Sequence, residues 1–531
     1  MRKVHLALAA VIACALVSVG IASATHNADL HSANMSLVSS NTDGGTYNGG
    51  TDLAFWDKYM IAGNLSPGGF RIYDVSNPAA TTEVSNFVCN GSQSDVSIWD
   101  NLVFVSIDGA RSSPACNSGS GSAWEGIRIV SIADPANPTQ IATVRTDCGS
   151  HTHTLVPDLP NNRILLYVLS YPLGENSTFC PQTRHAISIV EVPLANPAGA
   201  SVIATPDVGP SAVIGCHDVT VHLEKKIAAA ACLATESQIW DISNPVAPVI
   251  LSRIPNPAIN IHHSTTFSWD GNTAVLGDEL GGAAVAPGCV VDNQLATTGA
   301  LWFYDITNRA LPIIKSHYHI PQRDAGTVCS AHNFNTLPTT SNRDVLTSAW
   351  YSGAMTTVDF TDPANPFQVG YYIPKTSLGA NMWSTYWYRD HMYGNNRNAR
   401  GIDVFALNDA ALNADAVELP RMNQSTMEPF GPTLASVRWL RVAKAARGAV
   451  VRWRTAAETQ LAGFNLYRTR NGKLVRLNRG LIPALAAGNA SGRSYRYADR
   501  LGRQGTTYHL QVVALDGKKS WFGTTTVRQG S

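Results

Sequence analysis

Short runs of β-branched and aromatic residues recur through most of the chain, and each run leads into a turn. The copies occupy residues 70–78, 127–135, 238–245, 301–308 and 357–363. Their turns are built from Asp, Ser, Thr, Asn and Pro, which hydrogen-bond local backbone and end a strand. A second apolar run follows every copy, and no helical periodicity lies between copies. Repetition at a period of roughly 40 to 60 residues predicts an all-β propeller of four-stranded blades.

The repeated run is the third strand of its blade, so the earlier strands are found by counting back to the preceding alternating runs. This count predicts a seven-bladed β-propeller over residues 33–408, with a six-bladed count as the main alternative. The seven units start near Asp52, Asp95, His153, Asp218, Ser264, His332 and Ser384. The seventh unit lacks an obvious fourth strand. Residues 35–39 would supply it, and such closure removes exposed sheet edges.

The repeated phrase resembles the LVIVD-repeat family of bacterial secreted proteins. The resemblance covers most of residues 50–408, and it implies a propeller architecture far more than an activity. The acidic residues of the phrase, among them Asp74, Asp241 and Asp305, are expected to accept backbone N–H bonds in the following turn. We therefore assign them a structural role.

A second domain is predicted after a linker. Residues 409–434 carry Ala, Asn, Pro and Met without periodicity, which is typical of a linker. Residues 435–528 contain alternating runs of strand length separated by turn residues, and they predict a small β-sandwich. This part resembles a fibronectin type III domain, whose core aromatic positions are matched by Trp453, Tyr467 and Tyr508. The resemblance implies a spacer or adhesion module.

The N-terminus predicts export. Residues 1–24 are a predicted signal peptide, with Arg2 and Lys3, an apolar stretch, and a small-residue cleavage pattern near Ala24. A lipoprotein cleavage box ending at Cys14 is the alternative, but the residues that follow it stay apolar. No later segment has the roughly 18 uncharged apolar residues of a membrane span. The expected location is secreted, extracellular or periplasmic.

Charge divides the chain in two. Residues 435–531 hold 18 Lys and Arg against 3 acids, a net charge of +15, whereas residues 25–434 have a net charge of −16. The basic domain is therefore expected to contact polyanions or the acidic propeller. The candidate binding patch consists of six arginines: Arg468, Arg470, Arg476, Arg493, Arg496 and Arg500. The alternative is that these arginines form only a solvated basic surface. Specific nucleic-acid binding is not predicted for an exported, acidic propeller.

Imidazoles and carboxylates recur where the first strands begin. The candidate metal ligands are His153, His217, Asp218, His263 and His332, with Glu279 at the end of a second strand on the same face. Such a ring suits copper, zinc or iron, because neutral imidazole and carboxylate are ligands of these ions. The alternative is that these groups hydrogen-bond backbone at the blade ends. No catalytic residue is identified, and the motifs of serine hydrolases, zincins and nucleotide-binding enzymes are missing from the sequence.

Eight cysteines remain once Cys14 leaves with the signal peptide, and an exported chain is expected to pair them. Blade topology predicts four pairs: Cys89 with Cys116, Cys148 with Cys180, Cys216 with Cys232, and Cys289 with Cys329. These bonds would staple the face that carries the histidines. Three Gly-, Ser-, Pro- and Asn-rich insertions, near 110–126, 171–185 and 281–299, are expected to rise from that face.

Two functions follow from these features. The first is a secreted or cell-surface binding protein, whose extracellular protein or polysaccharide ligand sits on the stapled face between the long insertions. The second is a metal-dependent oxidoreductase or lyase with its ion at the channel mouth. Fold alone does not choose between them.

Overall fold

The structure is a computed structural model, and it forms two compact units, Met1–Glu428 and Pro429–Ser531. It describes residues 28–41, 48–121, 124–170, 180, 185–209, 215–279, 299–322, 329–341, 343–375, 380–398, 400–429, 437–455, 458, 461–470, 473–486, 492–514 and 519–527. The predicted signal peptide lies outside these residues. Within the described part of the chain, no helix is long and apolar enough to cross a membrane.

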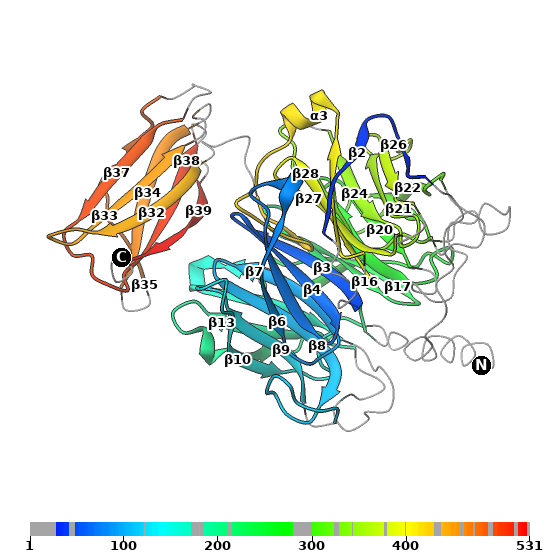
Figure 1. Cartoon of the computed structure of the whole chain (residues 1–531), viewed down its shortest axis with the longest axis horizontal. Helices are drawn as coiled ribbons and strands as arrows, with labels where there is room; N and C mark the ends of the chain where they lie inside the picture. The colour runs from blue at the N-terminus through cyan, green and yellow to red at the C-terminus, as the bar shows by residue number, and fades with distance from the viewer. Residues whose placement is uncertain are drawn as a thin grey trace. The chain divides into compact units, whose positions relative to one another are not determined.

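Most strands of the first unit lie in antiparallel groups in which strand order follows the chain (Figure 1). The first group is β3 (Asn48–Trp56), β4 (Tyr59–Ser66), β5 (Gly69–Asp74) and β6 (Thr82–Val88), and the second is β7 (Gln93–Trp99), β8 (Leu102–Arg111), β9 (Trp124–Ser131) and β10 (Thr139–Arg145). The third group is β11 (Thr152–Asp158), β12 (Arg163–Leu169), β13 (Ser188–Pro193) and β14 (Ser201–Ala204), and the fourth is β15 (Asp218–His222), β16 (Ile227–Cys232), β17 (Glu236–Asp241) and β18 (Val249–Ile254). The next are β19 (His262–Phe267), β20 (Thr273–Asp278), β21 (Leu301–Asp305), β22 (Ile313–Tyr318); β23 (Phe334–Thr336), β24 (Val345–Ala349), β25 (Met355–Asp359), β26 (Phe367–Ile373); and β27 (Met382–Tyr388), β28 (His391–Asn396), β29 (Ile402–Leu407). Short helices lie at η2 (Pro78–Ala80), η3 (Leu159–Asn161), η4 (Pro197–Gly199) and α3 (Ala410–Asp415).

The repeated phrase forms the third strand, and its Asp ends that strand as predicted. Asp74 accepts the backbone N–H of Ser76 at 2.9 Å, and Asp241 accepts that of Ser243 at 2.7 Å. The register between third and fourth strands then shifts at the same place in each repeat, as between Ile72 and Tyr73. Such a bulge increases local twist, so the phrase both stops the strand and twists the outer edge of the sheet.

The first strands contact one another in sequence order. β3 contacts β7, β7 contacts β11, and so on through β15, β19, β23 and β27, which contacts β3 again. The last sheet is completed by the N-terminal strand β2 (Met35–Asn41), which pairs with β29 from Met35 opposite Leu407 to Asn41 opposite Ile402. The prediction that residues 35–39 supply this strand is confirmed. A further short strand, β1 (Leu30–His31), pairs with β26. The first unit is thus a β-propeller-like repeat structure.

Residues 409–428 are not a linker in the structure. They form α3 and a hairpin of β30 (Arg421–Asn423) and β31 (Thr426–Met427), in which β30 pairs with β3 and β31 pairs in parallel with β15. The Asn423 amide bonds both the N–H and the C=O of Ile98, and the Thr426 hydroxyl donates to the Leu155 carbonyl. Polar side chains of the segment thus add hydrogen bonds to those of its short backbone pairings. The segment therefore lies among the first strands of four sheets.

The second unit has two antiparallel sheets packed around one apolar core. One sheet is β32 (Val437–Lys444), β33 (Ala449–Thr455) and β37 (Ser494–Asp499); the other is β35 (Lys473–Arg476), β34 (Leu461–Arg470), β38 (Thr507–Ala514) and β39 (Lys519–Thr526), with β36 (Ile482–Pro483) beside β34. Trp453 is fully buried and stacks on Tyr495, with ring centroids 5.2 Å apart. Buried Arg468 forms an ion pair with Asp499 at 2.7 Å, so this arginine is no part of a solvated patch.

Three disulfides join the predicted partners: Cys89–Cys116, Cys148–Cys180 and Cys216–Cys232. The guanidinium of buried Arg128 donates to the Asn90 and Pro114 carbonyls beside the first of these bonds, which ties the 110–121 segment to the sheet. Cys329 is buried and has no disulfide partner among the described residues, and its predicted partner Cys289 lies outside them.

Candidate metal centre

The candidate site is built where successive first strands begin. His217 directly precedes β15, and His263 is the second residue of β19. His332 lies two residues before β23, and Trp383 is the second residue of β27. The backbone N–H groups of His217 and His332 both donate to the neighbouring second strand, to Ala231 and Ala349. Equivalent backbone positions therefore bring these side chains to one end of the ring of first strands.

The aromatic rings form a continuous chain around that end. Ring centroids are 4.6 Å apart between His151 and His217, 3.8 Å between His217 and His263, and 4.4 Å between His263 and His332. The chain ends on Trp383, 4.6 Å from His332. Four imidazoles in a row are a concentration of nitrogen donors suited to a borderline transition metal.

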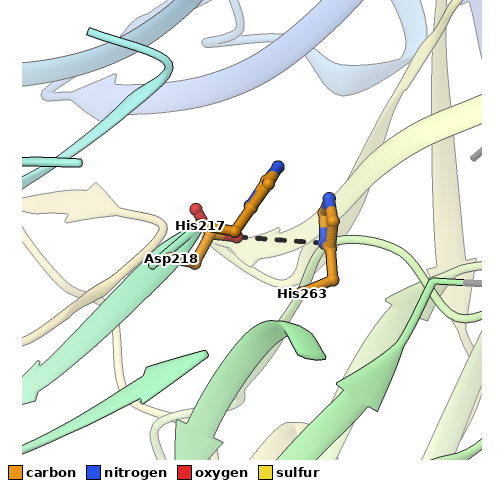
Figure 2. Close-up of side chains that lie close together, drawn as sticks. All are labelled: His217, Asp218 and His263. Carbon is orange, nitrogen blue, oxygen red and sulfur yellow. Dashed lines mark ion pairs between the residues drawn. The ribbon is translucent and has the colours of Figure 1, made fainter. Parts of the chain in front are cut away.

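Two groups of three side chains have ligand atoms within 4.8 Å of one another, and His263 belongs to both. In the first group, His217 and His263 flank the carboxylate of Asp218 (Figure 2). Asp218 Oδ2 lies 3.4 Å from His217 Nδ1 and 4.0 Å from His263 Nδ1. In the second group, Glu279 lies between His263 and His332, with Oε2 3.4 Å from His263 Nε2.

The orientation of His332 fixes which of its nitrogens can bind a cation. Its Nδ1 donates to the carbonyl of Trp383, and because a carbonyl can only accept, Nδ1 carries the proton. In a neutral ring Nε2 then has the lone pair, and it lies 3.6 Å from Glu279 Oε1. That same oxygen already accepts a hydrogen bond from the Tyr351 hydroxyl. Two acceptors thus face each other in a buried place, an arrangement that a proton or a metal ion between them would stabilise.

Burial keeps the imidazoles of His263 and His332 neutral. It lowers the pKa of His332 to about 3, and burial together with the neighbouring histidines holds the pKa of His263 well below its ordinary value. Burial also raises the pKa of Glu279 to about 7. Burial opposes ionisation of Asp218, yet the charge and hydrogen bond of His217 keep the pKa of that carboxyl below its ordinary value. Neutral imidazole beside carboxylate is the protonation state that metal binding requires.

A buried polar layer lies beneath the histidines. The Asn333 amide donates to Asp52 at 2.5 Å, and the Ser264 hydroxyl lies within hydrogen-bond distance of Asn333 Oδ1 at 2.9 Å and of Asp218 Oδ2 at 3.2 Å. Gln424, from the turn between β30 and β31, donates to Asp95 at 2.5 Å. Burial and the neighbouring carboxylates of Asp95 and Asp218 raise the pKa of Asp52 well above its ordinary value. The hairpin therefore closes the ring of strands below the histidines. Above them, Glu279 retains 14% side-chain exposure.

His153, which the sequence predicts as a ligand, lies outside both groups. Its two ring nitrogens contact the hydroxyls of Ser97 and Ser106 at 2.7 and 2.8 Å, and its Nδ1 is 3.2 Å from Asp95 Oδ2. His151 occupies the position in the ring chain instead, and it contacts Asp108 at 2.7 Å. The sequence does not distinguish the two histidines, because His151 and His153 are each followed by a threonine.

Two further residues at the site were not predicted from the sequence. Tyr351, which follows β24, donates to Glu279 and packs on His332 with ring centroids 4.6 Å apart. Arg397 follows β28, and its guanidinium carbon lies 5.3 Å from the centroid of Trp383. Neither residue belongs to the repeated phrase, and both approach from neighbouring sheets, so no local pattern marks them. Of the insertions expected to rise over this face, residues 171–179, 181–184 and 280–298 lie outside the described residues.

Comparisons with known proteins bear on the fold only. Among solved structures, a candidate 6-phosphogluconolactonase from Bacteroides fragilis is 10% identical, with a TM-score of 0.44 over 75% of this chain and 95% of that one. Sqt1 from Chaetomium thermophilum is also 10% identical, with a TM-score of 0.43 over 70% of this chain and 99% of its own. No curated protein matches the chain. A family model for the LVIVD repeat matches residues 65–88, which hold the end of β4 and all of β5 and β6.

Proposed function

We propose that the first unit is a seven-bladed β-propeller and that the second is a fibronectin type III-like sandwich. The cyclic contacts from β3 through β27 and back to β3 support the first assignment. The buried Trp453 and Tyr508 between two antiparallel sheets support the second. Export to an oxidising compartment fits the three disulfides, because paired thiols persist there.

We further propose that the propeller binds one transition-metal ion at its histidine cluster and acts as a metal-dependent enzyme, an oxidoreductase or a lyase. The main observation behind this proposal is the position of His332 Nε2, which has a free lone pair in the neutral ring and lies 3.6 Å from Glu279 Oε1. The protein ligands would come from His217, His263, His332, Asp218 and Glu279. Nitrogen and oxygen donors without cysteine suit copper, zinc or iron.

The residues around the cluster support proton transfer and the binding of an anion. In the cluster without an ion, burial raises the pKa of Glu279 to about 7, so this carboxyl would exchange a proton near neutral pH when it is not bound to the metal. Tyr351 shares a hydrogen bond with this carboxyl and would hold it in place. Arg397, held over Trp383, supplies positive charge beside Glu279 and favours a substrate with a carboxylate or another anionic group. A bound ion would add Lewis-acid or redox chemistry.

The test is the metal content of the mature protein, purified without chelators or a histidine tag. His263→Gln removes the imidazole shared by both groups, and His317→Gln on the exposed side of β22 is the matched control. We expect close to one ion per chain in the wild type and in the control, and loss of the ion in His263→Gln. A folded wild type that stays metal-free after incubation with copper, zinc and iron would overturn the proposal.

A second candidate is a binding protein whose ligand sits on the same face without chemistry. The Cys216–Cys232 bond favours it, because the bond fixes the residue directly before His217 and so stiffens the rim of the cluster. Binding to extracellular protein or glycan arrays that is unchanged in metal-free His263→Gln would support this candidate over the enzyme.

A further inference from the structure

Three arginines stand directly opposite one another on the second unit. In the sheet of β32, β33 and β37, Arg441 pairs with Arg452, and Arg452 pairs with Arg496. All three side chains are exposed, and so is Arg454, two residues along β33 on the same face. We call Arg441, Arg452 and Arg496 the arginine row.

The carboxylates of this unit do not neutralise the row. Of its three acids, Glu458 is fully buried and bonds Thr455 and Tyr495, while Asp499 is buried against Arg468 and Tyr508. The third, Asp516, lies outside the described residues. Two of the three acidic side chains are thus buried and bonded inside the unit. The +15 net charge of residues 435–531 is therefore carried largely by the surface.

Like charges opposite each other across antiparallel strands are destabilising. Repulsion between the paired arginines therefore lowers the stability of the folded unit. A bound polyanion would replace this repulsion with attraction between the arginines and the negative charges of the ligand. Neighbouring strands are about 4.8 Å apart, so the row presents cations at a regular spacing close to the length of one sugar ring. Trp439, next to the row on β32, has its ring centroid 5.3 Å from the Arg441 guanidinium carbon and is half-buried.

We propose that the arginine row binds a linear acidic polysaccharide. The carboxylate or sulfate groups of such a chain repeat along its length and match a row of fork-shaped guanidinium donors. The flat indole of Trp439 gives an apolar surface for a sugar ring beside the row. Single-stranded nucleic acid would need several aromatic side chains to stack successive bases. Among the described residues of this sheet face, half-buried Trp439 is the one aromatic side chain beside the row.

The test uses the full chain and polygalacturonate as the probe, with neutral dextran as the uncharged reference. The triple variant Arg441→Gln, Arg452→Gln, Arg496→Gln removes the row. Lys473→Gln, Arg476→Gln, Arg479→Gln removes three equally exposed charges from the same unit. We expect the row variant to bind polygalacturonate about tenfold more weakly and the control variant to stay within about twofold of the wild type.

Unfolding by denaturant separates binding from folding, because removing the like-charge pairs should leave the row variant at least as stable as the wild type. Equal weakening in both variants would reduce the effect to net charge and overturn the proposal. So would tighter, row-dependent binding to single-stranded DNA or to phosphatidylserine vesicles, or the failure of the wild type to bind polygalacturonate at all. Dextran sulfate, tested beside polygalacturonate, distinguishes sulfate from carboxylate as the recognised group.

Discussion

His509 is a buried imidazole that is unconnected with the candidate metal centre. It lies on β38 with 9% exposure, and its Nε2 contacts the hydroxyl of Thr469 at 2.8 Å. Burial lowers the pKa of His509 to about 4. In the unfolded chain the same ring takes up a proton near pH 6.5. The unfolded state therefore binds more protons than the folded state between these two values.

We predict that the second unit loses stability as pH falls from about 6.5 to about 4, by roughly 3 kcal/mol at the lower end. Hydrogen exchange of β34 and β38 peptides in the full chain, corrected for intrinsic rates, measures this as the free energy of opening. His509→Gln should remove most of the pH dependence. The exposed His31→Gln should leave it unchanged, and an unaltered slope in His509→Gln would contradict the assignment.

At the scale of single residues, the sequence predicts what local chemistry decides. The phrase aspartates accept the N–H groups expected of them, and the three disulfides described join the expected cysteines. The sequence does not separate His153 from His151, because both lie at the start of the same strand and only backbone pairing distinguishes their positions. Tyr351 and Arg397 reach the site through tertiary packing, which no local pattern reports.

The hairpin of β30 and β31 is the element that sequence reasoning missed. It has few apolar residues and no alternation, since its place is held by side-chain amides and hydroxyls among buried strands. Pattern-based prediction assigns such a segment to a loop, because the method reads alternation and not hydrogen-bonding partners. The strands of the repeats, in contrast, are long, alternate clearly and end in recognisable turns.

Replacing Asn423 with Leu should destabilise the first unit by about 2–4 kcal/mol, because the N–H and C=O of Ile98 would both lose their partner in a buried place. Denaturant unfolding of the full chain measures the change. Asn308→Leu removes an exposed turn amide that bonds the Ala310 N–H, and it should cost less than about 1 kcal/mol. Equal effects of the two variants would show that the hairpin contributes little.

At the scale of the whole molecule, two short strands near the N-terminus of the first unit cover the edges of its last two sheets. β2 completes the sheet of β27, β28 and β29, with Met35 fully buried. β1 adds to the edge of β26. Together they cover sheet edges that would otherwise present unpaired backbone groups.

Deleting residues 28–41 together with the residues before them should lower the stability of the first unit by roughly 3–5 kcal/mol and promote association through the exposed edge of β29. Light scattering after gel filtration and denaturant unfolding measure the two effects. Deleting residues 1–24 alone is the control and should change neither. A monomeric, equally stable deletion variant would contradict this role for β2.

The hairpin and β2 also determine the order in which the chain can fold. Asn423 and Ile98, which are hydrogen-bonded, are 325 residues apart in the sequence. Strand β2 pairs with β29, which lies near the end of the same unit. A chain that emerges from its N-terminus first must therefore hold β2 and the backbone groups of Ile98 without these partners until almost the whole unit has been synthesised or exported. Individual sheets can form early from local pairings, whereas the contacts of β2 and of the hairpin, which join distant parts of the unit, form only late in folding.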